Sequence, residues 1–213
     1  MIIQLPTKFS LLPIAEVKNG NLLIYQLTRF EDLMYELTYA CKKRRCTYCG
    51  KKLTQKNSTL DHRYPRDTGG ISITDNLYPC CPKHNSEKGN LTHEEYLKVQ
   101  RLPKKERKKY LNTIARYREK TFKKIGFVLP KKWVIYEDIN KIKYPKKQIL
   151  RGKKYHRIVE FYQRYKKIPR PVIVDRNNYI LDGYNIIIFA NDFRIKKIPV
   201  VKLNNVIVSE KRG

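Results

Sequence analysis

The sequence contains few acidic residues: 19 Asp and Glu stand against 47 Lys and Arg, which gives a net charge of +28. Small soluble domains usually stay within about eight charges of neutrality, so solubility alone does not account for this excess. A surface this positive attracts a polyanion. Nucleic acid is the first candidate, because phosphates bind lysine and arginine and release counterions. An anionic membrane surface is the second.

Long apolar runs are also absent. No stretch approaches the roughly 18 apolar residues that a membrane span needs. The first 20 residues do not resemble a signal peptide, because they lack a basic start and Pro6, Lys8 and Pro13 interrupt the apolar stretch. We therefore expect a soluble, cytoplasmic protein. Hydrophobic residues still make up 41% of the chain and aromatic residues 11%, which excludes disorder throughout.

Cysteine does not occur outside the stretch from Cys41 to Cys81. In a reducing compartment such a cluster indicates metal binding more than disulfides. Cys46 and Cys49 are separated by two residues, and Cys81 and His84 repeat that spacing. Three thiolates and one imidazole make a closed tetrahedral zinc site, which is structural because no position is left for water.

Two further cysteines stay outside this prediction. Cys80 competes with its neighbour Cys81, but it lacks the two-residue spacing to His84. We expect Cys41 to be a core residue or to have no role in the metal site. Ordinary buried cysteines are the alternative for the whole set, and the two correctly spaced pairs argue against it.

The first part of the chain predicts an apolar arm and a helix. Residues 1–20 are expected to hold a short strand, and from Arg29 the apolar residues follow helical spacing. Further on, Thr68-Gly69-Gly70 predicts a loop, which we expect to join short extended pieces at residues 62–65 and 71–73. A helix is expected to begin at Pro82.

The next region is helical and basic. Thr92 and Glu95 have the spacing of a capping box at a helix start. A second helix is expected from about Pro103 to Lys124. Residues 101–124 contain eleven Lys or Arg and two acidic residues. Such a run is compatible with a solvated helix face, but its local excess favours a helix that follows nucleic-acid phosphates.

The last region alternates extended and helical patterns. We expect extended structure at residues 133–136, a helix at 155–165, and strands at 171–174 and 179–181. A helix after Gly183 and a strand at residues 198–203 follow. The mixture predicts a small α/β unit.

Polar residues that suit phosphodiester chemistry lie between and just after the two halves of the cysteine cluster. Asp61-His62 comes first, then Asn76, and Asn85 follows His84 directly. With the Gly-Gly pair and the Asn-Leu pair, this order resembles the HNH endonuclease family, also called ββα-metal nucleases, in its zinc-knuckle branch. The resemblance covers roughly residues 28–97. Each residue alone would suit a surface turn or a helix cap.

The resemblance implies a role for each of the four residues. His62 would be the general base, since a neutral imidazole accepts a proton from water near pH 7. Asp61 and Asn85 would bind one divalent cation, Mg²⁺ or Mn²⁺, through oxygen atoms. Asn76 would hold the loop that carries His62 by hydrogen bonds. The third position of the motif is Asn85 where many relatives have His, and it keeps an oxygen ligand.

Several basic residues are candidates for phosphate contacts. Lys88 is one, and Arg63 and Arg66 are equally compatible with plain surface charges. His93 is expected on a helix surface, and His156 at the surface or near a phosphate. The start of the basic helix contains five further candidates for phosphate contacts: Lys104, Lys105, Arg107, Lys108 and Lys109.

The C-terminal region resembles the ParB/sulfiredoxin-like fold. The resemblance rests on the segments at residues 168–174, 179–183 and 198–201. In that family a turn leads into a helix whose start, together with a nearby Arg, binds nucleotide phosphates. The turn here, at Asp182-Gly183, lacks the expected Arg, and no cysteine is present for sulfiredoxin chemistry. A module that positions DNA and a packing scaffold both remain open.

Together these features predict an α+β protein with four parts: an arm (residues 1–27), a zinc-stabilised HNH domain (28–97), a basic helical connector (98–128) and a ParB-like α/β domain (129–213). The predicted function is metal-dependent cleavage of DNA, with RNA also compatible. Structural zinc and catalytic Mg²⁺ or Mn²⁺ are the expected cofactors. The alternatives are a non-catalytic zinc-knuckle DNA-binding protein and a nuclease active only within a larger nucleoprotein complex. A homodimer is compatible with cleavage of both strands.

Overall fold

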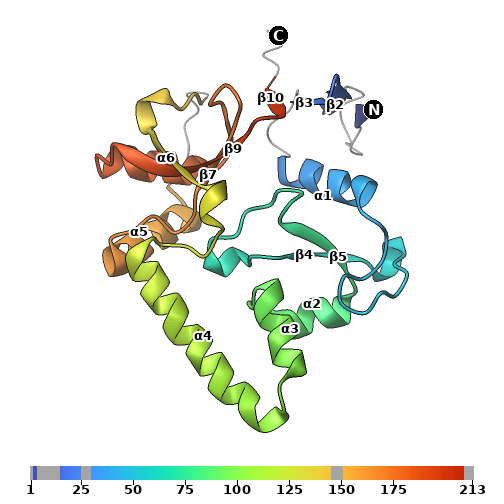
Figure 1. Ribbon diagram of the computed structural model, residues 1–213. Coiled ribbons are helices and arrows are strands. Elements are labelled where there is room, and N and C mark those ends of the chain that lie inside the picture. Colours follow the sequence, from blue (N-terminus) through green and yellow to red (C-terminus); the bar gives the residue numbers. More distant parts are fainter. Residues whose placement is uncertain (1, 4–14, 25–29, 145–150, 209–213) are drawn as a thin grey trace. The chain divides into compact units, whose positions relative to one another are not determined.

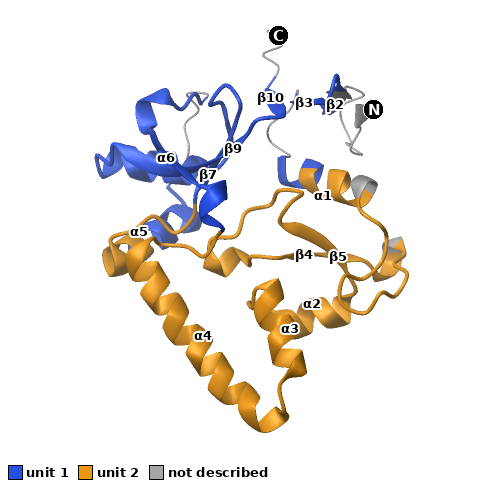
Figure 2. Ribbon diagram, in the orientation of Figure 1, with its two compact units in different colours: residues 1–33, 130–160, 171–213 blue, residues 34–129, 161–170 orange. Residues whose placement is uncertain are grey.

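The computed structural model describes residues 2–3, 15–24, 30–144 and 151–208. They form two compact units, one of residues 1–33, 130–160 and 171–213 and one of residues 34–129 and 161–170 (Figure 2). Both helices and strands occur in separate segments, so the predicted α+β class is confirmed. Among the described residues, each helix is too short or too polar to cross a membrane.

The first unit contains a four-stranded sheet built largely from the C-terminal region. Its strand order is β6 (Ile135–Asp138), β9 (Lys197–Leu203), β7 (Val172–Asp175) and β8 (Ile180–Asp182). Only the pairing of β7 with β9 is parallel within this described sheet. All four residues of β7 are buried, as expected for an apolar run inside a sheet.

Two helices accompany this sheet in the sequence, α5 (Lys153–Tyr165) and α6 (Tyr184–Asp192). α6 follows Gly183, which has a φ of +108°. A Cβ there would lie 3.1 Å from the Val172 Cα, so the turn into α6 requires glycine. These helices and strands confirm the secondary structure predicted for the C-terminal region.

The first unit also contains a sheet that joins the two ends of the described chain. Its order is β1 (Ile2–Ile3), β2 (Ala15–Lys18), β3 (Asn21–Ile24) and β10 (Val206–Val208). β10 runs parallel to β3. The expected arm, residues 1–27, contributes β1, β2 and β3, and its residues 1, 4–14 and 25–27 lie outside the described part of the chain. The boundaries of the four parts inferred from the sequence stay a proposal.

The second unit is organised around a ββα arrangement (Figure 1). Strand β4 (Thr59–His62) pairs antiparallel with β5 (Leu77–Cys80), and α2 (Pro82–Lys88) follows. α1 (Phe30–Cys41) precedes this hairpin in the chain, and α3 (His93–Arg101) and α4 (Lys104–Lys124) come after it. Thr92 and Glu95 form the predicted capping box at the start of α3.

The loop between β4 and β5 differs from the prediction. We expected extended pieces at residues 62–65 and 71–73, but β4 ends at His62 and the next strand begins at Leu77. Ile71 and Ile73 are buried without joining a strand. Their segment is held differently, because the Asn76 side chain donates a hydrogen bond to the Ile71 carbonyl at 2.8 Å. A side chain thus replaces the strand pairing that the apolar pattern suggested.

Gly70 in this loop leaves no room for a side chain. A Cβ there would lie 1.8 Å from the Tyr64 carbonyl oxygen and 2.6 Å from that of Pro65. Gly70→Ala is therefore expected to destabilise the protein by about 1–3 kcal/mol, the usual cost of overpacking. Denaturant unfolding measures this. Gly152→Ala is the control, because nothing lies within 4 Å of a Cβ at that position. Equal midpoints for the two variants would refute the prediction.

Candidate functional site

Four potential metal ligands meet beside the β4–β5 hairpin. The sulfur atoms of Cys46, Cys49 and Cys81 and a ring nitrogen of His84 all lie within 4.8 Å of one another. Cys46 and Cys49 lie in a tight turn closed by a hydrogen bond from the Gly50 amide to the Cys46 carbonyl (2.8 Å). Cys81 precedes α2, which places His84 on its first turn.

This donor set fits a zinc ion. Zinc–sulfur bonds of about 2.3 Å in a tetrahedron bring sulfurs to about 3.8 Å from one another, which needs only a small contraction here. His84 Nδ1 lies 3.0 Å from the Cys81 sulfur and 3.8 Å from the Cys46 sulfur. All four predicted ligands are in the cluster, which could therefore hold a zinc ion.

Cys80 does not join this cluster. Its side chain is buried in a small core with Cys46 and Leu53, and its thiol donates to the Cys81 carbonyl. Burial raises its pKa, so the thiol stays protonated. This arrangement agrees with the spacing argument that favoured Cys81. The side chain of Cys41 lies outside the part of the chain that the structure describes.

Asp61 lies in β4 and is almost fully buried, with 3% of the residue exposed. Lys88, the last residue of α2, is also buried, and its Nζ donates to Asp61 Oδ1 at 2.8 Å and to the His62 carbonyl at 2.9 Å. Tyr48 donates its hydroxyl to the other carboxylate oxygen, Oδ2, at 2.6 Å. The negative charge of Asp61 is therefore balanced inside the protein by a lysine that we had expected to contact phosphate.

Replacement of Lys88 is expected to lower the free energy of unfolding. Lys88→Met leaves the buried Asp61 carboxylate unpaired, and we expect a loss of about 3–5 kcal/mol in the free energy of unfolding. Lys83→Met is the control on the same helix, because the Lys83 side chain is 76% exposed and its contact to Glu87 is long, at 4.0 Å. That variant should stay within about 0.5 kcal/mol of the wild type. Urea unfolding compares the two, and similar losses would contradict the account.

His62 is held by a side chain that the sequence did not point to. Its Nε2 lies 3.0 Å from the hydroxyl of Ser72, a buried residue, and Arg66 donates to the same hydroxyl at 3.1 Å. His62 Nδ1 makes no hydrogen bond with any described residue. With the ring proton on Nε2, Nδ1 is thus free to accept a proton.

Burial keeps the His62 ring neutral. It lowers the pKa of His62 to about 4, because the desolvation outweighs the attraction of Asp61, and Lys88 adds to the lowering. At neutral pH the imidazole therefore has a free lone pair. A neutral imidazole is the form that a general base requires.

The two asparagines of the motif occupy different surroundings. Asn76 is fully buried, and its side chain bonds the Tyr64 amide (2.8 Å), the Tyr64 carbonyl (3.0 Å) and the Ile71 carbonyl. These bonds are those expected of a residue that holds the loop after His62. Asn85 is half-buried and donates through Nδ2 to Thr59 at 3.2 Å, which leaves its carbonyl oxygen for other contacts.

An open cavity of about 300 Å³ gathers the predicted catalytic residues other than Asn76. Its lining comes from β4, the loop after it and α2. The residues are Leu60, Asp61, His62, Pro65, Arg66, Asp67, Asn85, Lys88, Gly89 and Asn90. Asp61 and Asn85 thus line the same cavity, and their side-chain oxygens are a donor set that suits a hard divalent cation.

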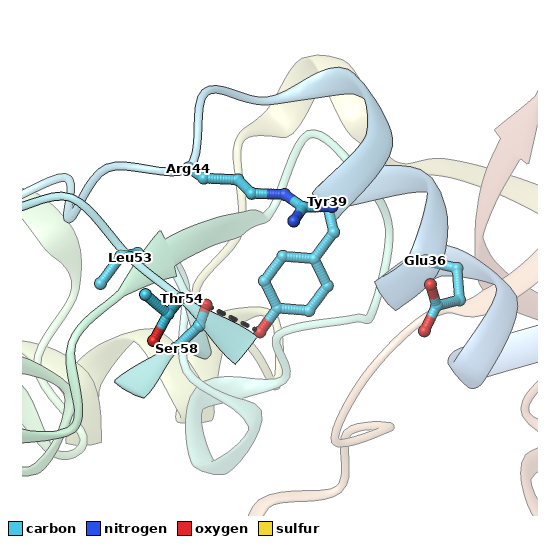
Figure 3. Close-up of a pocket in the computed structure, with 6 residues that line it drawn as sticks. All are labelled: Glu36, Tyr39, Arg44, Leu53, Thr54 and Ser58. Carbon is cyan, nitrogen blue, oxygen red and sulfur yellow. Dashed lines mark hydrogen bonds between the residues drawn. The ribbon is translucent and has the colours of Figure 1, made fainter. Parts of the chain in front are cut away.

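A second cavity of about 360 Å³ lies at the other end of β4 and is lined by Glu36, Tyr39, Arg44, Leu53, Thr54 and Ser58. Figure 3 shows the Tyr39 ring in this space, with its hydroxyl bonded to Ser58. None of the motif residues lines it. The smaller cavity is therefore the candidate site, although the second one is larger.

The predicted phosphate contacts lie in different surroundings. Arg63 pairs with Glu94 and keeps about a third of its side chain exposed, at 35%. Arg66 lines the cavity while it holds Ser72. Arg107 donates to the Leu102 and Gln100 carbonyls at the end of α3. The four lysines predicted at the start of α4 are exposed: Lys104, Lys105, Lys108 and Lys109. A role in DNA binding stays a proposal for all of these residues.

Three residues that we did not predict as site residues contact the site. Tyr48 and Ser72 bond directly to Asp61 and His62. His93, expected at a helix surface, lies 3.3 Å through Nδ1 from the Tyr48 hydroxyl, and its ring is stacked on Tyr78 with the centroids 5.9 Å apart. An aromatic residue inside a C-x-x-C pair was the single sequence feature that could have drawn attention to Tyr48.

A ββα unit with a Cys/His cluster at one end and an Asp-His pair in its first strand is the arrangement of a metal-binding nuclease domain. Residues 46–99 match the family model for HNH endonuclease. This part of the chain is therefore similar to the HNH endonuclease family, as the motif order predicted. This domain supports a nuclease or DNA-binding role in general terms.

Comparison with solved structures found ParB N-terminal domains of the pNOB8-like type. One is 19% identical, covers 32% of this chain and 28% of its own, and has a TM-score of 0.29. Another is 19% identical over 41% of this chain and 33% of its own, with a TM-score of 0.28. The chain thus spans about a third of the length of these structures. No similar protein was found among the curated proteins.

Proposed function

We propose that this protein is a metal-dependent endonuclease that hydrolyses phosphodiester bonds in DNA. One observation carries the proposal: a neutral His62 with an unbonded Nδ1 lines the same cavity as Asp61 and Asn85. A pure DNA-binding domain needs none of these three groups there. The excess of positive charge, +28 over the chain, supports nucleic acid as the substrate.

In the proposed reaction, His62 Nδ1 removes a proton from the attacking water. Ser72 keeps the ring in place while this occurs, and Asn76 keeps the following loop in place. Asp61 and Asn85 would hold a Mg²⁺ or Mn²⁺ ion, which would stabilise the charge that develops on the phosphate and the leaving oxygen. Zinc bound by Cys46, Cys49, Cys81 and His84 would have a structural role only.

A non-catalytic DNA-binding role is the second candidate. The observation that favours it is the pairing of Asp61, because both carboxylate oxygens already receive hydrogen bonds, one of them from an ammonium group. A cation bound there would lie close to the positive charge of Lys88. A nuclease that becomes active only with a partner would fit the same observation.

Cleavage of supercoiled plasmid distinguishes these candidates. The zinc-loaded chain is incubated with Mg²⁺, with Mn²⁺ and with neither; no chelator is added, so that the zinc remains bound. We expect nicked plasmid only when Mg²⁺ or Mn²⁺ is present, because one site cuts one strand. A gel shift without cleavage, on several DNAs and with both ions, would instead support the second candidate.

A further inference from the structure

Tyr48 connects the zinc cluster to the proposed catalytic cation site. It lies between Cys46 and Cys49, in the turn that the hydrogen bond from the Gly50 amide to the Cys46 carbonyl closes. Its hydroxyl reaches Asp61 Oδ2 at 2.6 Å. The ring is packed edge-on against Tyr96, with centroids 5.0 Å apart and an interplanar angle of 89°.

The hydrogen bonds around Tyr48 have a defined direction. The Asp61 carboxylate can only accept, so the Tyr48 hydroxyl is the donor in their 2.6 Å hydrogen bond. The hydroxyl oxygen is then free to accept a hydrogen bond from His93 Nδ1, 3.3 Å away. A chain of bonds therefore runs from His93 through Tyr48 to Asp61.

Two donors from different elements fix the plane of the Asp61 carboxylate. Tyr48 bonds Oδ2 from the C-x-x-C turn, and Lys88 bonds Oδ1 from the end of α2. Each carboxylate oxygen can accept about two hydrogen bonds or metal contacts, so both oxygens keep capacity for a cation. Among the proposed zinc ligands, His84 is followed directly in the sequence by Asn85, the second proposed ligand of the cation.

We propose that Tyr48 is a positioning residue that orients Asp61 for a divalent cation, and that the zinc cluster thereby supports the second metal site. This inference rests on the proposed function, since it takes Asp61 as a ligand of that cation. It assigns the cluster a part in building the catalytic site, beyond holding the fold. Partners that hold a metal ligand by hydrogen bonds commonly contribute about 10- to 100-fold to metal affinity.

Binding of Mn²⁺ to the full zinc-loaded chain without DNA tests this inference. The electron paramagnetic resonance signal of free Mn²⁺ gives the dissociation constant directly. Tyr48→Phe keeps the ring and removes the hydroxyl, and we expect Mn²⁺ to bind about 10- to 100-fold more weakly. Zinc content and the unfolding temperature are measured on the same samples and should stay close to the wild type.

Tyr96→Phe is the matched control. It removes a hydroxyl from the same aromatic cluster, but that hydroxyl bonds Glu87 at 2.8 Å and not Asp61. Its Mn²⁺ affinity should equal that of the wild type. A similar loss in both variants would overturn the inference, because the effect would then come from the cluster as a whole.

Asp61→Asn separates this inference from the proposed function. If Asp61→Asn weakens Mn²⁺ binding and Tyr48→Phe does not, the positioning role is wrong while the cation site stands. If Asp61→Asn leaves Mn²⁺ binding unchanged, the cation site is wrong and the role of Tyr48 falls with it. Weaker binding in both variants, with Tyr96→Phe unchanged, supports the inference.

Discussion

Replacement of His62 by alanine is expected to lower the rate of DNA cleavage about 100- to 10,000-fold, the usual contribution of a general base. The physical reason is that the site then lacks its neutral group with a free lone pair beside Asp61 and Asn85. DNA binding and zinc content should not change, because His62 bonds Ser72 and none of the zinc ligands. Single-turnover cleavage of a labelled duplex measures the rate.

His156→Ala provides the control for this experiment. His156 is exposed on α5 and lines neither cavity. The His156→Ala variant should cleave DNA at the wild-type rate. If His62→Ala retained more than about a tenth of the wild-type rate, His62 would not be the base. Loss of DNA binding in His62→Ala would show instead that the substitution disturbs the fold.

Loss of zinc is expected to unfold the region between Cys46 and Lys88. Structural zinc sites contribute about 10–16 kcal/mol of apparent binding free energy at pH 7, which is as large as the usual stability of a whole domain. Without zinc, the turn at Cys46–Gly50 would keep only a small core with Leu53 and Cys80 and a few hydrogen bonds, such as those of Thr47 to the Pro79 carbonyl. Cys81→Ala should therefore abolish zinc binding and make this region exchange its amide hydrogens rapidly. Metal analysis and hydrogen exchange measure the two effects.

Cys80→Ala is the matched variant, because the two cysteines are neighbours and Cys80 faces the small core with Cys46 and Leu53. It should retain one zinc ion per chain and lose only some stability from the smaller side chain. A protein that loses zinc with Cys80→Ala and keeps it with Cys81→Ala would reverse our ligand assignment. If the purified wild-type protein contained no zinc, the prediction of a zinc site would be wrong.

The sequence predicted those features whose residues are close together or follow a regular spacing. The two ligands within each predicted zinc pair are separated by two residues, so a single turn brings them together. The capping box at Thr92 and the apolar run of β7 also depend on neighbours in the chain. For this reason their structure could be read from local pattern.

Features that depend on distant contacts could not be predicted. A lysine is usually exposed, and nothing in the residues around Lys88 indicated that Asp61, 27 positions away, would bury it. The Ser72 hydroxyl became part of the site only because the loop bends it back to His62. The apolar pair Ile71 and Ile73 suggested a strand, but the fully buried Asn76 determined the loop instead.

The parallel pairing of β10 with β3 has a consequence for how the chain is made. Val206 lies opposite Leu22, so β3 leaves the ribosome long before its partner exists. At about 5–20 residues per second, the wait is roughly 10–40 s. Residues 34–129 are complete within that interval and include all four zinc ligands. Residues 34–129, with the four proposed zinc ligands, can therefore fold while the sheet of the other unit is still unfinished.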